Sequence, residues 1–83
     1  MGKKISSISS SSIIYSIQPQ QIRRQLNMSQ SQFSQAFGIP LRTLQGWEQG
    51  RRNLDMTAAS YLRIISKFPK EIQAILAENN QSL

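Results

Sequence analysis

The chain has 83 residues, enough for one small domain with a modest hydrophobic core. Ten lysines and arginines outweigh four acidic residues, and the resulting formal charge of +6 and pI near 10.6 indicate a polyanionic partner, of which nucleic acid is the commonest. The sequence has neither cysteine nor histidine and its four carboxylates are scattered, so we expect no enzyme, no metal site and no cofactor.

The first segment, residues 1–17, differs in composition from the rest of the chain. Serine dominates it, with an unbroken run from Ser9 to Ser12, which is typical of a segment that buries too little apolar surface to become ordered. Serines also interrupt its apolar residues, so it resembles neither a secretion signal nor a membrane span. We expect a flexible, Ser-rich N-terminal arm over residues 1–17 and a folded domain over residues 18–83.

The end of this arm carries β-favouring apolar residues: Ile13, Ile14, Tyr15 and Ile17. Two interpretations stay open. The segment can pack on its own domain as a short extended arm, or it can bind a partner protein by adding to a sheet or a groove.

The first predicted helix begins near Pro19 and runs to Leu26, with Ile22 and Leu26 as an i, i+4 core pair. Asn27 suits its end, because asparagine tolerates the left-handed conformation. A second helix is predicted after Ser29, which forms a capping-box pair with Gln32.

The second helix has one apolar stripe, made by Phe33, Ala36 and Phe37 at i, i+3 and i+4. Gly38 should end it with a left-handed cap, and Pro40 is suited to open the next helix. Together these features predict a helix-turn-helix.

In the third predicted helix, Leu44 and Trp47 face inward, while Gly46 lies on or near the outer side and Gly50 ends the helix. Trp47 is expected in the core rather than as a stacking platform.

Two further helices complete the prediction. Asp55 is a natural N-cap for a helix that reaches about Lys67, and Pro69 can open a final helix that frays from Asn79. Five helices without a sheet indicate an all-α domain.

The string LNMSQSQFSQAFGIPLRTLQGWEQGRR, residues 26–52, resembles the Xre or Cro/repressor-like helix-turn-helix family, and within it the HigA group of antitoxins. The resemblance implies a five-helix, lambda-repressor-like DNA-binding domain in the bacterial cytoplasm, associated with the nucleoid. It also implies a homodimer, because one such motif reads only a few base pairs and two-fold symmetry doubles a partly palindromic operator.

The resemblance assigns contacts with double-stranded DNA to eight residues: Gln30, Leu41, Arg42, Thr43, Gln45, Gln49, Arg51 and Arg52. Arg42 is the foremost base reader, since arginine pairs bidentately with guanine, although a phosphate contact is the alternative. Gln30 would contact a phosphate and brace the third helix. Gln45, Gln49 and the arginine pair would position the protein on phosphates.

Two other positions complete the comparison with the family. Glu48 is expected to pair with Arg23 and so to hold helices together. Gly46 stands where relatives carry a longer side chain, which either reduces the reading surface or lets the helix lie closer to the DNA backbone.

The resemblance further implies a repressor that is also the antitoxin of a toxin-antitoxin pair, with the toxin bound by Ile13 to Ile17. Leftover apolar residues suggest a dimer surface at Tyr61, Phe68, Ile72 and Leu76. The alternatives are a stand-alone repressor of phage or mobile-element origin and a pure protein-interaction module. The sequence predicts no membrane partner.

Overall fold

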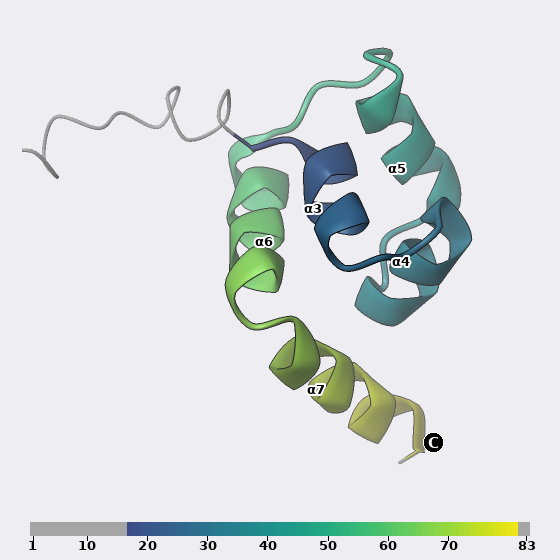
Figure 1. Cartoon of the computed structure of the whole chain (residues 1–83), viewed down its shortest axis with the longest axis vertical. Coiled ribbons are helices and arrows are strands. Elements are labelled where there is room, and N and C mark those ends of the chain that lie inside the picture. Colours follow the sequence, from purple (N-terminus) through teal and green to yellow (C-terminus); the bar gives the residue numbers. More distant parts are fainter. Residues whose placement is uncertain (1–16, 82–83) are drawn as a thin grey trace, which may run out of the picture.

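The structure is a computed structural model, and it describes residues 17–81. In this range the chain forms five α-helices and no strand, which confirms the predicted all-α class. The helices are α3 (Pro19–Gln25), α4 (Gln30–Phe37), α5 (Leu41–Glu48), α6 (Met56–Lys67) and α7 (Pro69–Gln81). In Figure 1, α3, α4 and α5 gather on one side of the molecule, while α6 runs beside α3 and leads into α7.

Local signals in the sequence set most helix ends. The Ser29 hydroxyl accepts a 3.0 Å hydrogen bond from the Gln32 N–H, and the Gln32 side chain accepts a 2.8 Å bond from the Ser29 N–H, which completes the predicted capping box. Asp55 accepts a 2.7 Å bond from the Ala58 N–H at the start of α6. Asn27 and Gly38 are both left-handed, with φ of 58° and 66°.

The core lies where α3 to α6 meet, and its fully buried side chains are Phe33, Phe37, Leu44, Leu62 and Ile65. The rings of Phe33 and Phe37 have centroids 4.8 Å apart and are tilted by 54°, within the distance range of favourable aromatic pairs. Ile39, in the turn before α5, is also buried, although the sequence did not mark it as a core residue. The turn between α4 and α5 is therefore anchored in the core.

Three details differ from the sequence prediction. Leu26 is the C-cap of α3 rather than its last helical residue. Pro40 was predicted to open α5 but is its N-cap, because its ψ of 136° is extended and the helix begins at Leu41. Trp47 is only partly buried, packed against the edge of the core. Within residues 17–81, no helix is long and apolar enough to cross a membrane.

Candidate nucleic-acid interface

Helix α5 has a buried side and an open side. Leu44 is fully buried and fixes the helix on the core. At about 100° per residue, Arg42 and Gln49 project from the opposite side, and both are exposed. Thr43 and Gln45 lie half-exposed on the flanks, and Leu41 is half-buried at the first turn. Arg42, Thr43, Gln45 and Gln49 thus border one outward surface. Leu41, three residues before Leu44, lies nearer the core side of the helix.

Basic and amide side chains surround a shallow hollow on this surface. Its lining consists of Arg42, Gln45, Arg51 and Arg52. All four were predicted to contact DNA, two from the helix and two from the loop that follows it. Among the described residues, none of these three arginines forms an ion pair with a carboxylate. Their charges therefore remain available to an anionic ligand.

Gly46 differs from its prediction. It was predicted on or near the outer side of α5, and its position in the helix agrees with that, but the residue is buried. The cover is Arg52, since a Cβ added to Gly46 would lie 3.1 Å from the Cβ of Arg52. The space that a larger residue would fill is occupied by the loop that follows α5.

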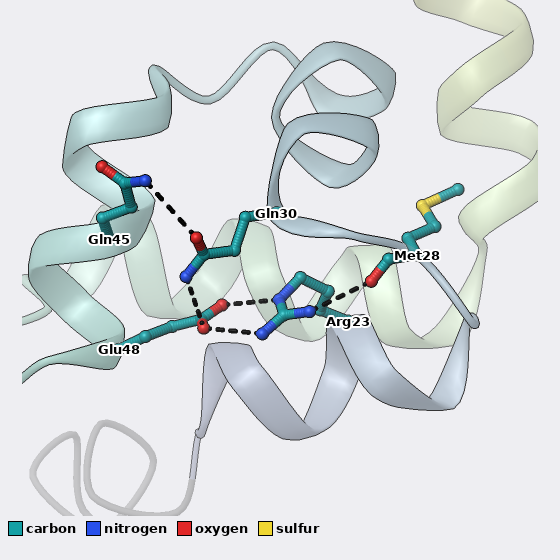
Figure 2. A network of polar contacts seen from close by, with 5 residues as sticks. All are labelled: Arg23, Met28, Gln30, Gln45 and Glu48. Carbon is teal, nitrogen blue, oxygen red and sulfur yellow. Dashed lines mark hydrogen bonds and ion pairs between the residues drawn. The ribbon is translucent and has the colours of Figure 1, made fainter.

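A network of polar contacts joins α5 to α3 (Figure 2). Arg23 donates two hydrogen bonds of 2.8 Å, from Nε to Glu48 Oε2 and from Nη2 to Glu48 Oε1. Its remaining nitrogen, Nη1, donates a 3.1 Å bond to the carbonyl oxygen of Met28. The predicted pair of Arg23 and Glu48 is confirmed, and its bidentate geometry is the strong form of an arginine–carboxylate contact.

The same network includes α4 through Gln30. Gln30 Nε2 donates a 3.0 Å hydrogen bond to Glu48 Oε1, and Gln30 Oε1 accepts a longer bond of 3.4 Å from Gln45 Nε2. Gln30 is therefore a brace between α4 and α5. Its amide nitrogen carries two hydrogens, so one is left for the phosphate contact that the sequence analysis assigned to it.

The ion pair of Arg23 and Glu48 shifts the pKa of both residues. The hydrogen bond from Arg23 holds the pKa of the Glu48 carboxyl below its ordinary value of 4.5, and Gln30 acts in the same direction while burial opposes them. The hydrogen bond to Glu48 likewise raises the pKa of Arg23. Glu48 is the only acidic residue before Asp55, and its side chain is 3% exposed. The one carboxylate on α5 is thus paired and turned inward.

Other predicted site residues lie elsewhere. Ile17 packs partly buried against the core, while Ile13, Ile14 and Tyr15 lie outside the described residues. Within residues 17–81, no cluster of three or more histidine, cysteine, aspartate or glutamate side chains could hold a metal ion.

A family model described as Helix-turn-helix matches residues 20–60, from α3 into α6. Residues 20–60 are thus a helix-turn-helix domain. It is also 35% identical over 54 residues to antitoxin HigA-2 of Vibrio cholerae, a match that covers 65% of this chain and 52% of that protein. The chain thus spans about half the length of this curated relative. No solved structure matches it.

The match to the helix-turn-helix model identifies the helices of the motif. Helices α4 and α5 are the two helices of the motif, and α5 is the recognition helix. The five helices agree with a lambda-repressor-like fold, and helix-turn-helix domains of this kind are DNA-binding modules.

Proposed function

We propose that this protein is a sequence-specific, non-enzymatic repressor that binds operator DNA as a homodimer. The observation that carries the proposal is the hollow lined by Arg42, Gln45, Arg51 and Arg52 on the open side of α5. An α-helix fits the major groove, where base edges carry the sequence, and the flanking cations pair with phosphates. The network around Glu48 holds α5 at a fixed angle for docking.

The dimer surface proposed here lies on α6 and α7. Ile64, Phe68 and Ile75 are 47%, 54% and 55% exposed, and exposed apolar side chains that gather in a patch mark interaction sites. Tyr61 and Ile72, which the sequence also suggested, pack instead against their own core. Phe68 and the half-buried Leu76 therefore remain from the sequence prediction, and Ile64 and Ile75 extend the surface.

The test of the DNA-binding function uses duplex DNA from upstream of the protein's own gene. Fluorescence anisotropy should show saturable binding by the full chain, weakened by at least tenfold when Arg42, Arg51 and Arg52 are all changed to alanine. Arg63, an exposed arginine of α6, is the matched control, and Arg63→Ala should leave the affinity unchanged. Unchanged binding by the triple variant would exclude this surface, and absence of specific DNA binding by the wild type would leave the protein-interaction module.

We propose further that the repressor is an antitoxin, because its similarity to antitoxin HigA-2 extends over 65% of the chain. In this role it would repress its own operon and neutralise a cognate toxin. The proposed toxin-binding segment is Ile13 to Ile17, since an apolar segment next to a Ser-rich tail can fold on a partner. Ile17 already packs on the core, so the segment would extend the domain continuously towards the toxin.

The antitoxin role is tested by purifying the tagged protein from its native cells at moderate salt with nuclease present. A small protein recovered in near-equal amount supports the antitoxin, and its absence leaves a stand-alone repressor. Removal of residues 1–16 keeps Ile17 on the core and should abolish toxin binding while DNA binding persists. Retained toxin binding would refute the assignment of this segment.

A further inference from the structure

The recognition helix carries its glycine on the side that faces away from the core. Gly46 is four residues after Arg42 and three after Thr43, so the three positions are neighbours on the helix surface. A glycine here leaves a gap in the row of side chains that α5 can present to a base pair.

The side chain of Arg52 fills this gap. A Cβ at Gly46 would lie 3.1 Å from the Cβ of Arg52, 3.8 Å from its Cδ and 3.9 Å from its Nε. Because the first distance is tighter than nine in ten real Cβ contacts, a side chain at Gly46 would require Arg52 to shift by a few tenths of an ångström. The methylene groups of Arg52 therefore run along α5 at the place where the helix has no side chain of its own.

The backbone holds the loop in this position. The carbonyl oxygen of Gly46 accepts hydrogen bonds of 2.9 Å from the Arg51 N–H and 3.1 Å from the Arg52 N–H. Gly50, with φ of 78°, makes the turn that returns the chain to the helix. Arg52 is thus attached to α5 by both its backbone and its side chain.

We propose that Arg52 is a specificity-determining residue that reads a base edge, of the guanine type, in place of the side chain that Gly46 lacks. This inference rests on the proposed DNA-binding function. Arginine is the side chain that pairs bidentately with guanine O6 and N7, and Arg52 borders the same hollow as Arg42 and Gln45. A stem already packed on the helix also loses less conformational freedom when the guanidinium docks.

The alternative is that Arg52 contacts a phosphate, which requires only its positive charge. A phosphate contact carries no sequence information, and lysine can replace arginine there as a point charge. Base reading needs the planar fork of arginine and the flat surface of Gly46 together. The two roles are separated by measuring sequence preference rather than affinity alone.

The experiment selects binding sites from a random-sequence duplex library with the full 83-residue chain and its variants. The wild type should select a motif. Arg52→Ala, Arg52→Lys and Gly46→Ala should each relax the preference at the same base pair, by roughly 10- to 100-fold. The double variant Gly46→Ala/Arg52→Ala should lose no more than either single change, because both remove one interaction.

Controls separate this inference from folding and from the proposed function. Alanine is a better helix former than glycine, and thermal unfolding will show whether Gly46→Ala is folded. Arg52 is exposed, so its variants test the inference even if Gly46→Ala does not fold. Arg63→Ala removes the same charge from α6 and should leave the motif unchanged. If Arg52→Ala weakens binding equally for all sequences, Arg52 is a phosphate contact and the inference is overturned, while the repressor function stands. If the wild type selects no motif, both fail.

Discussion

The hydroxyl of Tyr61 on α6 donates a 2.7 Å hydrogen bond to the carbonyl oxygen of Phe37, the last residue of α4. Carbonyls in the last turn of a helix have no partner within the helix, so a residue 24 positions later supplies one. The turn of the helix-turn-helix is therefore held from outside the motif, and α6 contributes to the angle between α4 and α5.

Removing this hydroxyl should lower stability without affecting the core. Tyr61→Phe leaves the Phe37 carbonyl without its partner, and we expect a loss of about 1 to 2 kcal/mol in urea unfolding. The matched control is Ser66→Ala, which removes an exposed hydroxyl that bonds to its own helix, and which should change stability by less than about 0.5 kcal/mol. Equal losses of unfolding free energy in the two variants would mean that the hydrogen bond from Tyr61 to Phe37 does not stabilise the protein more than an exposed hydroxyl does.

Breaking the ion pair of Arg23 and Glu48 should lower stability more than removing the Tyr61 hydroxyl does. Glu48→Gln leaves the Arg23 guanidinium, whose side chain is only 13% exposed, without a counter-charge, so we expect a loss of about 2 to 4 kcal/mol. Chemical denaturation measures the loss. Glu78→Gln, at an exposed position of α7, should be close to neutral. A stable Glu48→Gln variant would show that the pair does not hold α3 to α5.

The same carboxylate predicts how stability depends on pH. Because the pKa of Glu48 is lower in the folded protein than its ordinary 4.5, the unfolded chain binds the proton more tightly. Stability should therefore be constant near neutral pH and should fall as the pH drops from about 4.5 through the lower folded-state pKa. Unfolding free energies measured across this range should show a smaller acid slope for Glu48→Gln than for the wild type. If the unfolding free energies of the wild type and Glu48→Gln fall with the same slope, other carboxyl groups cause the loss of stability in acid.

DNA binding should weaken steeply with salt. Each neutralised phosphate contributes about −0.9 to the slope of log affinity against log salt concentration on B-DNA. Arg51 is exposed in the loop after α5, and Arg51→Ala should make the slope shallower by about one. Anisotropy titrations between low and moderate salt test this. A flat salt response of the wild type would contradict the electrostatic role of the interface.

Dimer formation gives a further test on α7. Ile75 is 55% exposed, and Ile75→Glu places a charge within the proposed apolar surface, which should weaken the dimer at least tenfold in sedimentation experiments. Ala77 is exposed two residues further along the same helix and projects in a different direction, so Ala77→Glu adds the same charge as a control. Dimers that persist in Ile75→Glu would place the interface elsewhere.

The features that the sequence predicted are those decided by neighbours along the chain. The capping box at Ser29, the left-handed residues Asn27 and Gly38, and the N-cap Asp55 each depend on a few adjacent residues, and all are confirmed. The Arg23 and Glu48 pair, which lies 25 positions apart, came from family resemblance. Residue types alone would not have paired them.

The features that it missed depend on contacts between distant segments. Ile39 has no helical period to mark it as a core residue, and only the packing of the turn buries it. The Tyr61 hydrogen bond requires α6 to be placed against the end of α4. The cover that Arg52 gives to Gly46 depends on how the loop folds back, which a helical wheel of α5 does not include.

That cover has a consequence for exchanging parts between relatives. If one of the residues that α5 presents belongs to the following loop, the determinants of specificity are not contained in one continuous helix. Transplanting residues 41–48 alone into another scaffold would deliver a surface with a gap at Gly46. A graft of residues 41–52 would carry Gly46, the turn and Arg52 together, and so would transfer the complete set of specificity residues as one segment.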